Sequence, residues 1–419
     1  MKVYFETYGC TMNQGDSEIM RARVPREHEL VEDPGECDVA VLNSCGVIGY
    51  TERKILKRVS ILKDSGKKVL VAGCIPKINM EGVVASGADA ILPAKDIGYI
   101  GEVLQELSRN KRFLTYGGNN GFEKAGIPKA RGSSSIAIIP IAEGCLGGCS
   151  YCATRFARGR LRSFKLEGIV KEAEECVAKG YRELRLTAQD TAVYGRDKGW
   201  SLPELLTRIC KIEGVFRIRI GMMNPRYATE MLDELIEACR DEKVYKFFHI
   251  PLQSGDDEVL KHMNRGYTVR DFIGIVKAVR RNFRQLTVAT DDIVGYPTED
   301  EESFKKTYDL IRAIKPDILN ITRFSPRPGT GAFGLNDMPE RYKKERSRKF
   351  ASLHKNIVSK INKTFIGKEF NVLITKKGKK DSLLGRTDFY KQVVIKSGKI
   401  GEIKKIRIID AKYNYLIGN

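Results

Sequence analysis

No stretch of about 18 consecutive apolar residues occurs in the 419-residue chain, so the sequence offers no candidate for a membrane-spanning helix. The N-terminus, MKVYFETYGC, also lacks the long apolar core of a secretory signal peptide. Ten cysteines are present, and in a long chain without an export signal they favour reduced, metal-binding thiolates over disulfides. These absences predict a cytoplasmic protein, and the length of 419 residues predicts two or three domains.

Acidic residues are scarce near the C-terminus. Residues 339–364 contain nine Lys or Arg against two Asp or Glu, and residues 365–419 contain thirteen against five. This fifth of the chain therefore carries fifteen of the net +20 charges. A polyanion such as nucleic acid is the natural partner for this surplus, and a generic solvated basic surface is the alternative.

Strand and helix patterns alternate over residues 1–110, which predicts a parallel-sheet α/β domain. Strands are expected at 2–9, 37–43, 67–73 and 88–94, and helices at 17–24 and 51–66. Cys10, Cys45 and Cys74 each follow one of the first three strands. Because parallel neighbours end at the same sheet edge, these cysteines are expected to converge, the alternative being three unrelated buried thiols.

Composition divides the rest of the chain. Residues 111–133 are Gly-rich and aperiodic, which indicates a linker. Residues 134–338 contain six strand–helix units and predict a partial (β/α)6 barrel, with strands at 135–142, 182–189, 216–223, 246–253, 286–296 and 317–325. Residues 339–364 form a basic helix, and the short strands of 365–419 predict a small antiparallel barrel of the oligonucleotide-binding type.

The stretch AEGCLGGCSYC lacks a fourth metal ligand. Cys145, Cys149 and Cys152 follow the first barrel strand, with Tyr151 just before the last, and no His or further Cys is nearby. Structural zinc sites and cubane iron–sulfur clusters both use four protein ligands. Three thiolates would leave one iron open to a substrate or cofactor, and a redox-inert zinc site is the alternative.

With this C-x3-C-x2-C spacing, the sequence resembles the radical S-adenosylmethionine (SAM) enzymes. The resemblance implies a [4Fe–4S] cluster held by Cys145, Cys149 and Cys152 whose open iron chelates SAM. Reductive cleavage of SAM then produces a 5′-deoxyadenosyl radical that abstracts a substrate hydrogen.

Further stretches resemble the methylthiotransferases among these enzymes. They are YGCTMNQGDSE, VLNSCGV, VAGCIPK, EGCLGGCSYCATRFARG, LTAQDTAVYGRD, HIPLQSGDDEVLKHMNRGYT, TDDIVGYPTED and FSPRPGT. ARGRLRS and DTAVYGRD are similar to the archaeal and eukaryotic branch, which modifies N6-threonylcarbamoyladenosine at tRNA position 37. The last 55 residues resemble the TRAM domain, an RNA-binding barrel.

The resemblance implies a second [4Fe–4S] cluster on Cys10, Cys45 and Cys74, from which sulfur is delivered to adenosine C2 before a second SAM donates methyl. The implied partner is tRNA with a modified adenosine 37; the electron donor, the sulfur source and the oligomeric state are not predicted. Alternative substrates are isopentenyladenosine in tRNA and a ribosomal-protein aspartate. The non-enzyme alternative is a zinc-stabilised RNA-binding protein.

The sequence departs from the family pattern in three places. Thr298 stands before Glu299 where Gly is usual, Asp292 replaces an apolar residue, and the region between the first two strands is short. These changes affect the prediction of the exact substrate and leave the predicted class of enzyme unchanged. Eukaryotic members also tend to carry a C-terminal membrane anchor, and since this chain ends with its small barrel, a free cytoplasmic enzyme is implied.

Other residues are candidate contacts of SAM or RNA, and none is assigned as an acid or base. His249 is expected to be a satisfied core residue. Gly295 is expected to let adenine approach the backbone closely, with a tight turn as the alternative. For Gln189 and Asp190 the alternative is loop capping. The cofactor-binding candidates are Tyr151, Gln189, Asp190, Gln253, Ser254 and Gly295.

The RNA-binding candidates lie in two basic regions. The first is an exposed run after the cluster motif and the second is a loop of the C-terminal barrel, whose alternative is an inert charged hairpin. They are Arg158, Arg160, Lys376, Lys377, Lys379, Lys380, Arg386, Phe389 and Tyr390. The remaining cysteines, Cys37, Cys176, Cys210 and Cys239, are assigned to no cluster.

Overall fold

A computed structural model describes residues 1–111, 114–115 and 121–419. Part of the expected linker, at 112–113 and 116–120, therefore lies outside the described residues. The chain packs as two compact units, each treated separately below. Unit 1 contains residues 1–132, 140–169 and 325–333, and unit 2 contains residues 133–139, 170–324 and 334–419.

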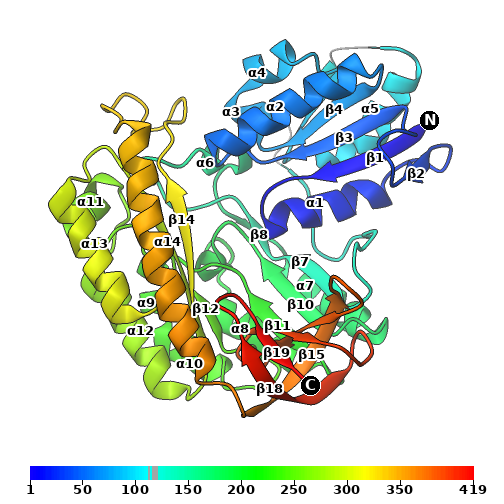
Figure 1. Cartoon of the computed structure of the whole chain (residues 1–419). Helices are drawn as coiled ribbons and strands as arrows, with labels where there is room; N and C mark the ends of the chain where they lie inside the picture. The colour runs from blue at the N-terminus through cyan, green and yellow to red at the C-terminus, as the bar shows by residue number, and fades with distance from the viewer. Residues whose placement is uncertain (112–113, 116–120) are drawn as a thin grey trace. The chain divides into compact units, whose positions relative to one another are not determined.

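Unit 1 is built on a parallel sheet in the order β2-β1-β3-β4-β5-β6 (Figure 1). Every residue of β3 is buried, as expected for a strand covered on both faces. The four strands expected from the sequence are confirmed, and short edge strands β2 and β6 extend the sheet. The bounds are β1 Lys2–Thr7, β2 Glu29–Val31, β3 Val39–Ser44, β4 Lys68–Gly73, β5 Ala90–Pro93 and β6 Leu114–Thr115.

Helices cover both faces of this sheet. Ile19 and Met20 of α1 pack with α5 on one face, whereas Ile55 and Val59 of α2 pack with α3 and α4 on the other. Two apolar layers therefore enclose the strands and fix their register. The helices are α1 Thr11–Ala22, α2 Gly49–Asp64, α3 Ile75–Ile78, α4 Met80–Ala85, η1 Ile97–Tyr99 and α5 Ile100–Ser108.

The segment that carries the second cysteine motif also belongs to unit 1. It contains β8 (Ala142–Glu143), α6 (Thr154–Arg158) and β9 (Arg162–Ser163), with β8 and β9 paired antiparallel. Residues 325–333 complete this unit, where the Ala332 amide donates to the Ser150 carbonyl at 2.7 Å. Both cysteine motifs are thus parts of one compact unit.

Unit 2 contains the expected arc of parallel barrel strands. Two three-stranded sheets, β11-β10-β7 and β12-β13-β14, are joined by a parallel bridge between Ile218 and Val244. All six strands expected from the sequence are confirmed. Their bounds are β7 Ile136–Pro140, β10 Glu183–Thr187, β11 Arg217–Ile220, β12 Phe247–His249, β13 Thr287–Val294 and β14 Ile318–Arg323.

Helical segments alternate with these strands, as a βα series requires. The longest, α14, is the basic helix expected at 339–364. The segments are α7 Leu166–Ala178, η2 Thr191–Val193, α8 Leu202–Cys210, α9 Pro225–Glu230, α10 Leu232–Ala238, α11 Asp257–His262, α12 Val269–Asn282, α13 Glu301–Ile314 and α14 Glu340–Lys363.

The C-terminal residues form a closed five-stranded barrel in the order β15-β16-β17-β19-β18. One pair, β17 with β19, is parallel, which differs from the fully antiparallel barrel expected. An apolar core that includes Phe370, Val393 and Ile406 fills it. The strands are β15 Glu369–Lys377, β16 Leu383–Thr387, β17 Gln392–Ile395, β18 Ile403–Ala411 and β19 Leu416–Gly418.

The turn at 387–391 of this barrel packs against the starts of the unit 2 strands. Arg217, the first residue of β11, pairs with Asp388 at 3.0 Å, and Thr287, the first of β13, donates to the Phe389 carbonyl. Tyr390 reaches Glu183, the first residue of β10, at 3.2 Å. The small barrel therefore closes the N-terminal end of the (β/α) barrel.

Over the residues that the structure describes, we find no helix with the length and apolar character needed to cross a bilayer.

Candidate active site

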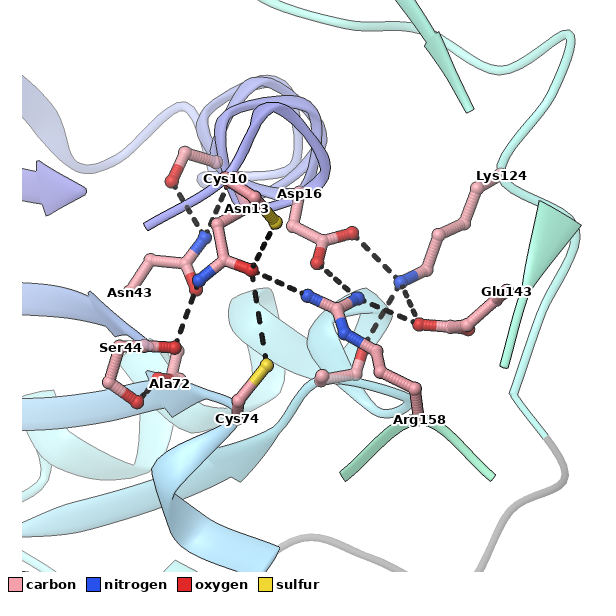
Figure 2. Close-up of polar contacts among 12 residues, drawn as sticks. Cys10, Asn13, Asp16, Asn43, Ser44, Ala72, Cys74, Lys124, Glu143 and Arg158 are labelled. Carbon is pink, nitrogen blue, oxygen red and sulfur yellow. Dashed lines mark hydrogen bonds and ion pairs between the residues drawn. The ribbon is translucent and has the colours of Figure 1, made fainter. Parts of the chain in front are cut away.

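Cys10 and Cys74 lie near each other at the carboxyl edge of the unit 1 sheet (Figure 2), and Cys45 lies at the same edge. They follow β1, β3 and β4, which are neighbours in the sheet, so the expected convergence is confirmed. The Cys10 and Cys74 thiols lie 3.7 and 3.9 Å from one atom, Asn13 Oδ1. Cys45 is close to the same asparagine. A Cβ added to Gly9 would lie 2.9 Å from the Cys45 sulfur and 3.3 Å from Asn13 Nδ2.

Asn13 is held in the middle of these thiols. Its Nδ2 donates to the Tyr8 carbonyl at 2.8 Å and to the Ser44 carbonyl at 2.9 Å. Asn43 Nδ2 in turn donates to the Asn13 carbonyl at 2.7 Å. The amide therefore ties the ends of β1 and β3 together and fixes where the thiols meet.

The thiols near Asn13 are in a poorly solvated environment. Burial, with smaller contributions from nearby Cys74 and Cys10, raises the pKa of Cys45 to about 11. Burial also raises the pKa of Cys74, whereas Arg158 opposes that shift. Without metal Cys45 and Cys74 are thiols at neutral pH, and binding of a cation would release their protons.

The backbone beside the thiols leaves no space for a side chain. Gly9 has φ +100°, and an added Cβ would lie 2.6 Å from Cys45 Cβ. Such a conformation is accessible to Gly at little cost. The glycine thus allows Cys45 to approach the loop that carries Cys10, and three thiolates are the kind of donor that iron–sulfur clusters use.

The second motif forms a tight loop. The Cys145 amide donates to the Gly159 carbonyl at 3.2 Å, and the Cys152 amide donates to the Cys149 carbonyl at 3.1 Å. A Cβ added to Gly147 would lie 3.4 Å from the Cys145 sulfur and 3.7 Å from the Cys149 sulfur. Both thiols therefore border the same small residue, and all three cysteines of this loop are partly accessible.

Within 1–111, 114–115 and 121–419, no group of three or more Cys, His, Asp or Glu side chains is placed to hold a metal ion. A cubane cluster makes a different demand, since each thiolate binds a separate iron and the sulfurs stay further apart than around one ion. The lack of a single-ion site among the described residues is therefore compatible with cluster binding.

Four buried charges lie beside the first cysteine group (Figure 2). Arg158 pairs with Asp16 at 2.6 Å and with Glu143 at 2.8 Å, and Lys124 pairs with both acids at 2.8 Å. All four side chains are at most 1% exposed. Arg158 also donates to Asn13 Oδ1 at 2.8 Å.

This network joins the two cysteine motifs through charge and hydrogen bonding. Glu143 lies two residues before Cys145, and Arg158 ends the helix after Cys152. Burial works against ionisation of Glu143, yet Lys124 and Arg158 together hold its pKa below the ordinary value. Two cations and two anions therefore balance within unit 1.

The position of Arg158 corrects a sequence-based expectation. Its guanidinium was expected in an exposed basic run that contacts RNA, but it is 1% exposed and fully engaged by acids. The local run RFARGR is basic, and only tertiary packing turns its second arginine inward. Arg160, two residues later, is exposed as expected.

Two of the cofactor-binding candidates instead support loops of unit 2. Asp190 accepts from the Ala192 and Asn224 amides at 3.1 Å, and burial raises its pKa to about 6. Ser254 is fully buried and accepts from the Asp256 amide at 3.3 Å. Loop capping, the alternative for Asp190, is thus what the structure shows, and Ser254 has no surface for a ligand.

Three residues remain candidates for contacts with the cofactor: Gln189, Gln253 and Tyr151. Gln189 and Tyr151 are partly exposed. Gln253 adopts φ +71°, and its buried Oε1 accepts no hydrogen bond from the described residues. A strained backbone with an unsatisfied acceptor is typical of a ligand-binding position.

Gly295 is explained by packing within unit 2. Its φ is +73°, and an added Cβ would lie 2.4 Å from Lys343 Cγ. The expected close approach is therefore made by the aliphatic stem of a lysine on α14, not by adenine. Lys343 then donates to the Phe324 carbonyl at 2.9 Å and pairs with Asp337 at 2.7 Å.

The positions that depart from the family pattern have unsatisfied polar atoms. Neither carboxylate oxygen of buried Asp292, nor the Thr298 hydroxyl, has a hydrogen-bond partner among the described residues. Burial, together with nearby Asp291 and Glu299, raises the pKa of Asp292 well above its ordinary value. His249 is satisfied as expected, through Asp291 Oδ1 at 2.8 Å.

The aromatic RNA-binding candidates are not available for base stacking. Phe389 is 2% exposed within the small barrel's core, and Tyr390 is 7% exposed. Tyr390 packs on Tyr245 and Phe247 with ring centroids 4.8 Å away in each case. These rings stabilise the docked turn, which corrects the expectation that they contact RNA.

The basic candidates of the small barrel remain accessible. Arg386 is partly buried and its guanidinium lies 4.6 Å from the Tyr390 ring, so it supports the same turn. The lysines at the end of β15 and in the following loop are exposed: Lys376, Lys377, Lys379 and Lys380.

Models of three known families match consecutive parts of the chain. Residues 2–92 match "Uncharacterized protein family UPF0004", residues 139–311 match the radical SAM superfamily, and residues 363–419 match the TRAM domain. A radical SAM methyltransferase, TsrM from Kitasatospora setae, has a similar fold, with a TM-score of 0.57, 16% identity and coverage of 79% of this chain and 75% of that one. A six-stranded parallel arc with C-x3-C-x2-C after its first strand defines a radical SAM enzyme.

Relatives that match this chain over its full length identify its family among the radical SAM enzymes. A protein from Archaeoglobus fulgidus named "Probable threonylcarbamoyladenosine tRNA methylthiotransferase" is 49% identical, with 100% of this chain and 98% of the relative covered. A similarly named Pyrococcus horikoshii protein is 44% identical with 100% and 99% covered, and the human threonylcarbamoyladenosine tRNA methylthiotransferase is 32% identical with 100% and 73% covered. The chain belongs to the threonylcarbamoyladenosine tRNA methylthiotransferase family.

Proposed function

We propose that the protein is a tRNA methylthiotransferase that converts N6-threonylcarbamoyladenosine at position 37 to its 2-methylthio derivative. The observation that carries this proposal is the presence of two three-cysteine groups in one compact unit. Each group offers three cysteine thiolates, one fewer than the four irons of a [4Fe–4S] cluster. One open iron can bind SAM and the other can bind sulfur, which are the two ingredients of a methylthio group.

The cysteines have separate roles in this proposal. Cys145, Cys149 and Cys152 hold one [4Fe–4S] cluster, and Cys10, Cys45 and Cys74 hold the other. When bound, the first cluster would supply the electron that cleaves SAM, and the second would supply sulfur and accept one electron as the C2–S bond forms. The substrate would lose its C2 hydrogen atom to the 5′-deoxyadenosyl radical, and the thiolate on C2 would then accept methyl from a second SAM, which leaves as S-adenosylhomocysteine.

The chain's other residues position these groups. Asn13 and Arg158 hold the first cysteine edge in place, and Gln189, Gln253 and Tyr151 are the remaining candidates for contacts with SAM. None is assigned as a general base, because radical abstraction of hydrogen requires no proton transfer. The reduced thiolates and the tRNA substrate support a cytoplasmic location.

The experiment is mass spectrometry of tRNA nucleosides after anaerobic incubation with SAM, a reductant and sulfide. We expect the 2-methylthio derivative of threonylcarbamoyladenosine. Product on isopentenyladenosine alone would contradict the substrate assignment. A colourless reconstituted protein, without broad thiolate–iron absorption near about 400 nm, would instead support a zinc-stabilised RNA-binding protein.

The exposed lysines of the small barrel are proposed to contact the tRNA backbone. Replacing Lys376, Lys377, Lys379 and Lys380 by Ala should weaken tRNA binding and reduce the slope of log K against log salt by about 2 to 4, since each phosphate contact releases about one counterion. Binding titrations at several salt concentrations measure both quantities.

Lys405→Ala is the matched control for this test. Lys405 is exposed on the same barrel, but its charge already pairs with Glu369 at 3.1 Å. An unchanged salt slope in the quadruple variant would show that these lysines are not the tRNA contact.

A further inference from the structure

Two arginines lie side by side on neighbouring strands of the unit 2 barrel. Arg185 of β10 and Arg219 of β11 are register partners, so their side chains share one face of the sheet. The Arg219 guanidinium lies 5.0 Å from the Phe247 ring and 5.7 Å from the Tyr390 ring. These distances place it over the aromatic floor that Phe247, Tyr245 and Tyr390 form.

The two arginines differ in how their charge is balanced. Arg185 Nε pairs with Glu183 at 2.5 Å, and the same carboxylate accepts from the Tyr390 hydroxyl at 3.2 Å. Arg219 makes no hydrogen bond or ion pair with any of the described residues, and its Nε is fully buried. Burial lowers the pKa of Arg219, and the neighbouring Arg185 lowers it further.

A partly buried guanidinium whose buried Nε has no partner among the described residues is costly unless a ligand compensates it. Ring faces offset only part of the desolvation cost of a charge, and a second nearby cation adds to it. Five N–H donors in a fixed fork are suited to a carboxylate, which binds them bidentately. The arrangement therefore favours an anionic group bound above the aromatic floor.

Arg219 lies between the docked turn and the C-terminal strand ends of the unit 2 barrel. The floor lies at the N-terminal end, where the turn at 387–391 is docked, and Arg219 is the penultimate residue of β11. Barrel enzymes place their chemistry at the C-terminal strand ends. An anion on Arg219 would thus lie on the C-terminal side of the aromatic floor, within the unit 2 barrel.

We propose that Arg219 binds the carboxylate of the threonylcarbamoyl group on the substrate base, with Arg185 adding to the local positive charge. This proposal rests on the proposed function. It makes Arg219 a specificity-determining residue, because isopentenyladenosine has no anionic group to compensate the guanidinium. A site that binds a substrate charge rejects a neutral analogue strongly, since its own charge would stay unpaired.

The test is a double-mutant cycle with two synthetic anticodon stem–loops. One contains threonylcarbamoyladenosine at position 37, and the other contains its neutral threonine-amide analogue. We compare kcat/KM for the 2-methylthio product, and equilibrium binding, between the reconstituted wild type and Arg219→Gln at one ionic strength. The wild type should prefer the carboxylate by about a hundredfold, and Arg219→Gln should lose that preference.

Arg281→Gln is the matched control, because Arg281 is exposed on α12 and the variant makes the same chemical change. Thermal unfolding checks that Arg219→Gln is folded, and binding of radiolabelled SAM separates the two carboxylates that Arg219 could meet. Unchanged SAM affinity with lost carboxylate preference supports the proposal. Reduced SAM affinity would assign Arg219 to the carboxylate of SAM and overturn it.

Failure of the proposal is distinguishable from failure of the function. If the wild type forms product on both stem–loops equally well, the function holds and the proposal is wrong. Equal loss on both stem–loops in Arg219→Gln also contradicts it. If the wild type forms no product on the threonylcarbamoyladenosine stem–loop, the proposed function itself is wrong.

Discussion

A Cys10→Ala variant is expected to cleave SAM while forming no 2-methylthio product. Cys10 belongs to the thiols around Asn13, at the sheet edge of unit 1, and not to the loop at 145–152. Removing one of three thiolates should cost this group its cluster, and with it the sulfur. Iron per chain should fall by about half, because one of two cubanes is lost. Iron analysis, 5′-deoxyadenosine release and nucleoside mass spectrometry measure the three quantities.

Cys145→Ala should show the complementary defect. The loop cluster supplies the electron for SAM cleavage, so both 5′-deoxyadenosine and the methylthio product should disappear. Iron should again fall by about half, since the thiols around Asn13 remain intact. The two variants therefore separate radical formation from sulfur insertion.

Cys37→Ala is the matched control for both variants. Cys37 is a buried unit 1 thiol near the start of β3, and it donates to the Pro34 carbonyl at 3.3 Å instead of joining either group. It should keep full iron and product. Full product from Cys10→Ala, with only one cluster's iron, would contradict the assignment of two clusters.

An Arg158→Met variant is expected to lose about 3 to 5 kcal/mol of unfolding free energy, the usual cost of removing one partner from a buried ion pair. Methionine keeps much of the side-chain volume but leaves Asp16 with Lys124, and Glu143 with Lys124 and the more distant Arg162 at 3.5 Å. Asn13 also loses the 2.8 Å hydrogen bond to its Oδ1. Urea unfolding of the reconstituted protein measures the change.

Arg155→Met is the control, because Arg155 is exposed on the same helix, α6. It should change stability by less than about 0.5 kcal/mol. Arg158→Lys should recover part of the loss, since lysine restores the charge but not the fork that reaches three acceptors. Equal stability of Arg158→Met and Arg155→Met would show that the network contributes nothing.

The elements of this fold follow largely from local sequence. The strands at 39–44 and 68–73 are short apolar runs, and α2 has apolar residues at helical spacing. Such patterns depend on neighbouring residues alone. The meeting of Cys10, Cys45 and Cys74 was also predictable, because parallel strands that end at one edge bring the residues after them together.

Side-chain environments were less predictable than elements. Arg158 and Arg160 stand two residues apart in one basic run, yet one is buried among acids and the other is exposed. Asp16 and Lys124, which make the difference, lie 142 and 34 residues away in the sequence. The environments of Gly295 and Tyr390 differ from the expected ones for the same reason. Gly295 packs against Lys343 and Tyr390 bonds to Glu183, and both partners are distant in the sequence.

The sequence alone determined the chemistry of this protein: three thiolates at C-x3-C-x2-C spacing, three more after successive strands, and a basic C-terminal region. Ligand identity and spacing are local properties, and they already limit which metal can bind. Only the tertiary structure decided which charges are paired. It buried Arg158 among partners and left Arg219 over an aromatic floor with no partner in the part of the chain that the structure describes, because burial and charge pairing depend on residues that only folding brings together.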